Sequence, residues 1–158
     1  MNATYVFALA FGIGIVAGLR SLTAPAAVSW AARLGWLDLH GSPLAFMGST
    51  AAVAVLSLAA LGEFVNDLLP KTPRRTAPAP LIARIVLGGL SGTCLCASAG
   101  LSPLAGAALG GVGGAIGAFA GYQARSRLVS ALNVKDAMIA IPEDLVAIGL
   151  AYFLVSPR

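Results

Sequence analysis

The stretch Leu104–Tyr122 reads LAGAALGGVGGAIGAFAGY and decides the class of this fold. It carries no charge and has about the length that an α-helix needs to cross a bilayer. Six of its glycines form two stripes with a spacing of four residues: Gly106, Gly110 and Gly114, and Gly113, Gly117 and Gly121. Such spacing lets membrane helices approach closely. It predicts helix packing, within the bundle or across a dimer; the alternative is a glycine-lined passage for a solute.

The composition of the whole chain leads to the same class. Of 158 residues, 58% are hydrophobic and 10% are charged, and the mean hydropathy is +0.89. Soluble domains carry about 25% charged residues, so this chain lacks the polar surface that keeps a protein dissolved. These values exclude a soluble enzyme, a disordered tail and a secreted disulfide scaffold. The net charge of +4 comes from short loops, which indicates membrane topology rather than nucleic-acid binding.

Five apolar stretches predict an all-α, polytopic membrane bundle in a single domain covering residues 1–158. The expected spans lie near residues 5–22, 44–69, 81–99, 104–122 and 137–155. Residues 21–33 contain Pro25, so they form either the bent end of the first span or a short interfacial helix. Pro142 predicts a second break, at the start of the last helix.

Basic residues are distributed unevenly between alternate loops. Six fall on the side of the N-terminus: Lys71, Arg74, Arg75, Arg125, Arg127 and Lys135. Arg33 and Arg158, with or without Arg20, fall on the other side. By the positive-inside rule, we expect a cytoplasmic N-terminus and an external C-terminus. Similar glycine and Arg-Ser motifs in residues 14–21 and 117–126 also suggest an inverted repeat, an architecture found in transporters.

Acidic residues within the apolar stretches are the candidate functional residues. A charged group at the bilayer centre costs about 2.5–3.5 kcal/mol, so it usually faces protein or water. Glu63 lies about 10 Å before the end of its span, and Asn66 and Asp67 share its helix face. Glu143 and Asp144 begin the last span and are expected at a similar depth.

Two hypotheses explain these carboxylates. Carboxylates close together in a low dielectric cannot all be ionised cheaply, so a proton, a metal ion or an arginine should lie between them. In a transport site, Glu63 and Glu143, assisted by Asp67, Asp144 and Arg20, would bind a cation or carry a proton. In a purely structural role, the acids would form ion pairs with arginines. The single histidine and the two cysteines within an apolar stretch lead us to expect no cofactor.

The chain resembles a family of small bacterial multi-pass inner-membrane proteins. The resemblance lies in Gly18-Leu19-Arg20-Ser21, in Glu63-x-x-x-Asp67-x-Leu69-Pro70-x-x-Pro73-x-Arg75-Thr76, in the glycine-rich stretch and in Glu143-Asp144. This family is catalogued only as a domain of unknown function, so the resemblance supplies no activity. It implies a bacterial inner-membrane location and marks six motif positions: Arg20, Glu63, Asp67, Arg75, Glu143 and Asp144.

Three functions remain open from the sequence. The first is a small transporter or channel-like protein, without catalytic residues, that binds a small ion or solute and forms a homo-oligomer, most simply a dimer. The second is an accessory or scaffold subunit whose charges only hold the bundle together. The third is an enzyme acting on a lipid phosphate, with carboxylates holding Mg²⁺ and Arg74 or Arg75 binding the phosphate.

Overall fold

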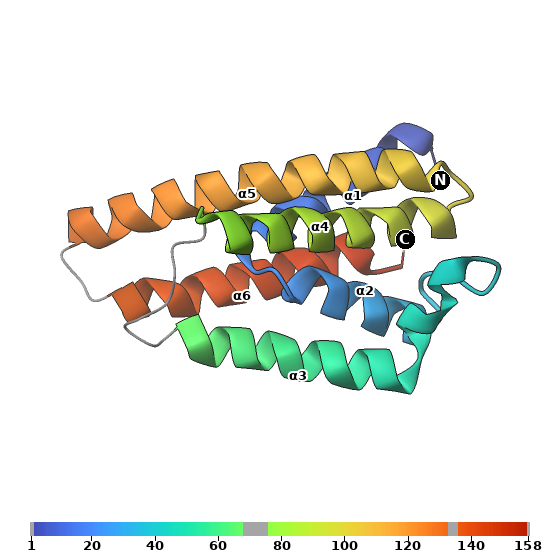
Figure 1. Cartoon of the computed structure of the whole chain (residues 1–158), viewed down its shortest axis with the longest axis horizontal. Helices are drawn as coiled ribbons and strands as arrows, with labels where there is room; N and C mark the ends of the chain where they lie inside the picture. The colour runs from blue at the N-terminus through green and yellow to red at the C-terminus, as the bar shows by residue number, and fades with distance from the viewer. Residues whose placement is uncertain (1, 68–75, 133–135, 158) are drawn as a thin grey trace.

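Every regular element in the described part of the chain is helical. The computed structural model describes residues 2–67, 76–132 and 136–157, without the side chains of residues 67, 136 and 137. The elements are α1 (Ala3–Leu19), α2 (Thr23–Arg33), the 3₁₀ helix η1 (Pro43–Gly48), α3 (Thr50–Asp67), α4 (Pro78–Ser98), α5 (Pro103–Leu132) and α6 (Asp136–Val155) (Figure 1).

The helices have the length and composition of a membrane bundle. Three are long and apolar enough to cross a membrane: Pro78–Ser98, Pro103–Leu132 and Met138–Val155. Two shorter helices are also apolar, Ala3–Leu19 and Thr50–Asn66. The all-α membrane bundle predicted from the sequence is thus confirmed.

Helix α5 packs against both α4 and α1 through its glycines. A Cβ added at Gly88 of α4 would lie 2.6 Å from the Gly110 carbonyl oxygen, and one at Gly18 of α1 would lie 2.5 Å from the Gly114 carbonyl oxygen. Gly106, Gly110 and Gly114 contact α4, Gly113 and Gly117 contact α1, and Gly121 is buried. Both glycine stripes are therefore used within the chain, and a dimer would need another surface.

Helices α1 and α5 run in the same direction. Gly14 meets Gly110, while Gly18 meets Gly114 and Ala118 further along both helices. The predicted inverted repeat is therefore wrong, because it requires its two glycine helices to run in opposite directions. The cause is a reversal of the chain directly after α1, where Arg20 is extended (φ −140°, ψ 109°).

The reversal makes α1 and α2 a hairpin instead of a single crossing. Tyr5 near the start of α1 and Trp36 after the end of α2 line one cavity, which Ser98 and Ser156 also line. Both chain termini consequently lie at the same end of the bundle (Figure 1). This arrangement does not fit the prediction of termini on opposite sides, because that prediction counted α1 and α2 together as one crossing.

Helix α2 is a core element rather than an interfacial one. Val28 and Ala31 are completely buried, and Ser29 donates a hydrogen bond of 2.5 Å to the Met47 carbonyl oxygen. Pro25 is accommodated because it lies in the first turn, where backbone N–H groups have no partner within the helix.

Other helix boundaries also differ from those predicted. α3 begins at Thr50, since η1 takes the preceding residues. α5 continues as one helix to Leu132, beyond the predicted span near residues 104–122. α6 begins at Asp136 and runs through Pro142, so the predicted break before that proline is wrong. The break in helical structure occurs instead between α1 and α2.

Candidate functional site

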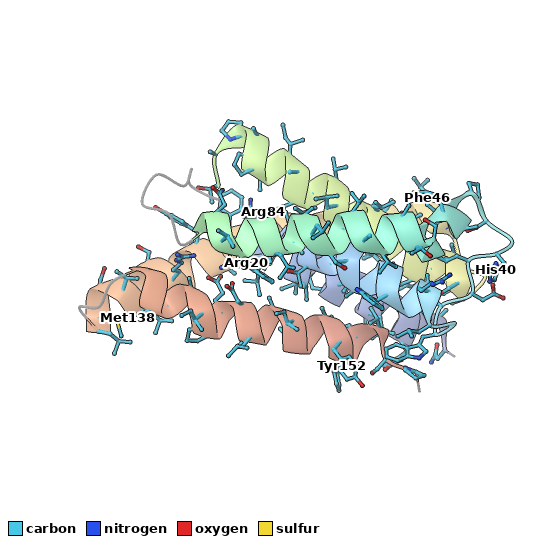
Figure 2. The ribbon with its side chains drawn as sticks, turned by 90° about the horizontal axis from the view of Figure 1, so that it is seen from below. Arg20, His40, Phe46, Arg84, Met138 and Tyr152 are labelled. Atoms are coloured by element: carbon cyan, nitrogen blue, oxygen red, sulfur yellow. The ribbon has the colours of Figure 1, made fainter. Side chains whose placement is uncertain are left out.

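A cluster of polar and charged residues surrounds the break between α1 and α2. We call it the break cluster, and it consists of Arg20, Ser21, Glu63, Arg84, Arg125, Glu143 and Asp144. Two residues come from the break itself, and α3, α4, α5 and α6 supply the others. Arg20 and Arg84 lie together inside the bundle, away from His40 and Tyr152 at the end that holds the termini (Figure 2). The cluster thus links nearly every helix of the bundle.

Glu63 caps the N-terminus of α2. Its Oε1 accepts hydrogen bonds from the Ser21 backbone N–H (2.9 Å) and the Ser21 hydroxyl (2.6 Å), and its Oε2 accepts one from the Leu22 N–H (2.9 Å). A helix N-terminus leaves such donors unsatisfied, and the side chain of Leu22 cannot cap them. A carboxylate is also favoured there by the helix dipole. Glu63 therefore fixes α3 to the break.

Arg84 caps the C-terminus of α1 in the same way. Its Nε donates to the Gly18 carbonyl oxygen (3.0 Å), and its Nη1 donates to the Pro80 carbonyl oxygen (3.1 Å). Carbonyl groups at a helix C-terminus lack partners and attract a cation. Nη2 of Arg84 lies 3.9 Å from Oε1 of Glu63. The two residues of the Glu63–Arg84 ion pair thus supply hydrogen-bond partners to both helix ends at the break.

Arg20 carries its charge into the centre of the bundle. Its side chain is 1% exposed and forms an ion pair with Asp144 of α6. The guanidinium carbon lies 5.6 Å from the centre of the Phe64 ring, a cation–π contact with α3. Burying this charge is costly, and removal of one partner of such a pair is strongly destabilising. The pair connects α6 to the break between α1 and α2, so the position of α6 depends on the conformation of the break.

Glu143 has an arginine partner of its own. Its Oε2 lies 3.5 Å from Nη1 of Arg125 in α5, and the two side chains are 12% and 11% exposed. The structure therefore brings Glu63 and Glu143 into one cluster but pairs each with a different arginine. This arrangement matches the structural alternative raised for these acids.

The remaining predicted residues lie at the edge of the cluster or beyond the described residues. Asn66 is exposed. The side chain of Asp67 and all of Arg74 and Arg75 lie outside the description. Among the side chains that are described, no three histidine, cysteine or acidic residues are placed to hold a metal ion together.

Two arginines of the cluster were not among the candidates from the sequence. Arg84 lies within the predicted span near residues 81–99 and has no role in the predictions, whereas Arg125 contributes there only to topology. The criterion used for the acids, a charge within an apolar stretch, applies equally to Arg84 in LIARIVL (81–87). For Arg125, the signal is its Arg-Ser motif, since Arg20 has the same motif and both arginines pair with neighbouring acids on α6.

The family model described as Domain of unknown function (DUF4126) matches residues 7–156. The chain belongs to the DUF4126 family. The match includes every residue of the break cluster and confirms the resemblance found in the sequence. The DUF4126 assignment specifies no activity. No curated protein and no solved structure matches the chain.

Proposed function

We propose that this protein is a small transporter of the bacterial inner membrane, and that its break cluster binds a proton or a small cation. The observation that carries the proposal is the buried Arg20–Asp144 pair at a break between two helices. Discontinuous helices at membrane depth build many transport sites, because their ends present free backbone groups and dipoles. Buried charges are also costly in a membrane, so they usually mark ion or substrate pathways.

The roles of the acids differ in this proposal. Glu63 accepts three hydrogen bonds at a helix N-terminus, so we assign it to holding the break. Asp144 and Glu143 are the acids that would accept the proton or cation. Neutralising either one removes the negative charge from its pair with Arg20 or Arg125, and this change in charge would drive α6 to move against α1 and α5.

The orientation in the membrane follows from the positive-inside rule. The connecting sequence between α3 and α4 contains Lys71, Arg74 and Arg75, and the end of α5 contains Arg125 and Arg127. We propose that this end of the bundle faces the cytoplasm and that both termini face outward.

Ion flux in proteoliposomes tests the transport proposal. The purified protein is reconstituted with a trapped pH dye, and proton flux is followed under imposed pH, Na⁺ and K⁺ gradients. Wild-type liposomes should exceed protein-free liposomes, and Asp144→Asn and Glu143→Gln should each reduce the flux at least tenfold. Arg127→Gln, which changes an exposed arginine of α5, is the matched control. Wild-type flux equal to that of protein-free liposomes in all three gradients would contradict the proposal.

The second candidate is an accessory or scaffold subunit. The observation that favours it is that Glu63, Glu143 and Asp144 each have an arginine partner. Replacing a whole buried ion pair by apolar residues is often neutral or stabilising. The double variant Arg125→Leu with Glu143→Leu therefore separates the candidates. A folded double variant without flux supports transport, whereas flux equal to wild type leaves this pair with a structural role only.

A further inference from the structure

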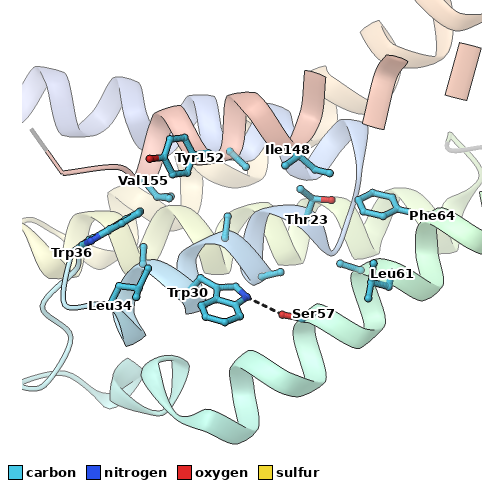
Figure 3. A pocket seen from close by; sticks show the side chains of 15 residues that line it. Thr23, Trp30, Leu34, Trp36, Ser57, Leu61, Phe64, Ile148, Tyr152 and Val155 are labelled. Carbon is cyan, nitrogen blue, oxygen red and sulfur yellow. Dashed lines mark hydrogen bonds between the residues drawn. The ribbon is translucent and has the colours of Figure 1, made fainter. Parts of the chain in front are cut away.

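An apolar groove runs along the side of the bundle that α5 does not cover (Figure 3). α2 forms its floor, and α3 and α6 form its walls. Its volume is about 490 Å³, within the roughly 300–1,000 Å³ of ligand pockets. Most of its lining is apolar and includes Ala27, Trp30, Leu34, Leu61, Ile148 and Tyr152.

The groove exists because α3 stands off from α6. The alanines of α2 have small side chains, which leaves space above this helix. The Trp30 indole N–H donates to the Ser57 hydroxyl (2.9 Å), which fixes the distance between α2 and α3. Leu61 on one wall and Ile148 on the other are 57% and 45% exposed. In a membrane bundle, a groove with such walls opens sideways to lipid.

The length of the groove matches one leaflet. From Thr23 to Leu34, α2 rises about 16 Å, close to half of the ~30 Å hydrocarbon core. The rings of Trp36 and Tyr152 meet edge to face at one end of the groove, with their centroids 6.0 Å apart. Tryptophan and tyrosine of this kind lie at the membrane–water interface. An acyl chain entering there would extend inward as far as Phe64.

A second cavity, of about 360 Å³ and lined by both polar and apolar residues, lies beside this end of the groove, across the last turn of α2. Arg33 and His40 line it together with Ser49, and none of its described lining residues is acidic. Arg33 is exposed and has no ion pair with any residue that the structure describes. Asp38 accepts the His40 backbone N–H (3.1 Å) but does not line the cavity. The cavity thus offers positive charge and hydrogen-bond donors, which are complementary to a phosphate.

We propose that the protein binds one anionic phospholipid of its membrane, with an acyl chain in the groove and the phosphate at Arg33 and His40. The length of the groove, its lateral opening to lipid and the positive charge of Arg33 each point to this occupant. Arg33 lies at the opposite end of α2 from the break cluster, which the groove reaches only at Phe64, and the proposal does not rest on transport.

Tryptophan quenching measures occupancy directly, because both tryptophans of the chain, Trp30 and Trp36, line the groove. The protein is placed in phosphatidylcholine nanodiscs with rising mole fractions of phosphatidylglycerol brominated on its acyl chain. A specific site gives a component that saturates at low mole fraction, above the linear quenching by surrounding lipid. Unbrominated phosphatidylglycerol should reverse the saturating component. Purely linear quenching in the wild type would overturn the proposal.

Two matched pairs of variants identify the site. Ala27→Phe fills the groove and should abolish the saturating component, whereas Ala54→Phe on the exposed face of α3 should retain it. Arg33→Gln should raise the half-saturating mole fraction about fivefold, and Arg127→Gln should not change it.

Each other outcome counts against the proposal. Equal saturation by brominated phosphatidylcholine contradicts the preference for an anionic lipid, because this lipid has the same phosphate but no net charge. Saturation retained in Ala27→Phe contradicts the chain site. If Ala27→Phe does not fold, the reversal by unbrominated lipid in the wild type decides alone. A signal that depends on protein concentration instead of lipid fraction would place a second copy of the chain in the groove.

Discussion

The two sides of this bundle are built in different ways. On the side of α1, α4 and α5, backbone meets backbone, because glycines remove the side chains that would separate the helices. On the side of α2, α3 and α6, apolar side chains of α2 and α6 pack into the core, polar contacts join α2 to α3, and a groove remains between the helices. The break cluster lies at the boundary between these two sides, which we call the seam. The comparison indicates that close backbone packing makes the half with α1, α4 and α5 rigid. The half with α2, α3 and α6 is looser, and its arrangement depends on charged residues.

The largest effect is expected at the seam. Arg20→Met removes the ion pair with the half-buried Asp144 and the cation–π contact with Phe64. We expect a loss of about 3–5 kcal/mol in unfolding free energy, because removing one partner of an ion pair inside the bundle is strongly destabilising. Denaturant unfolding in detergent, followed by circular dichroism, measures it. Arg127→Met, at an exposed arginine, should stay within about 0.5 kcal/mol of wild type; an equal loss in both variants would remove the distinction.

The next effect tests the rigid half. A Cβ at Gly110 would overlap the backbone of Gly88, which cannot move without shifting α4. Gly110→Ala should therefore lose about 3 kcal/mol or more. Gly62→Ala in α3 and Gly149→Ala in α6 are controls, since nothing lies within 4 Å of a Cβ there. The controls should be neutral or stabilised by up to about 1 kcal/mol. Similar losses in all three variants would show that the two halves pack alike.

A smaller and local effect is expected from Glu63→Ala, which leaves the N–H groups of Ser21 and Leu22 without their acceptor. Loss of a helix cap costs about 1–2 kcal/mol. Hydrogen exchange at these two amides should become faster than in the wild type, while amides in the middle of α5 keep their protection. Unchanged exchange at the break would mean that Glu63 does not cap α2.

The smallest effect tests the looser half. Ser57→Ala removes the acceptor of the Trp30 indole N–H, the side-chain hydrogen bond that joins α2 to α3. The expected loss is below about 1 kcal/mol, because the exposed indole finds other partners. The emission maximum of tryptophan should shift even so, since the environment of Trp30 changes. A loss as large as that of Gly110→Ala would show that the groove side is not loose.

Much of the rigid half could be predicted from the sequence. The glycine spacing predicted close packing of α5, and apolar length predicted the membrane helices. The hairpin could not be predicted, because an apolar stretch that ends at Arg20 looks the same whether the chain continues outward or turns back. The acids of the cluster were recognisable by their apolar context. Their pairing with Arg84 and Arg125 was not, because it depends on which helix ends the fold brings together.

The most direct test of a charge-held seam is a double-mutant cycle across Arg20 and Asp144. Unfolding free energies of wild type, Arg20→Met, Asp144→Leu and the double variant are measured in one detergent. If charge across the bundle holds α6 to the break, each single variant is strongly destabilised, and the double variant loses about 2–3 kcal/mol less than the sum of the two single losses. Losses that simply add in the double variant would contradict this account.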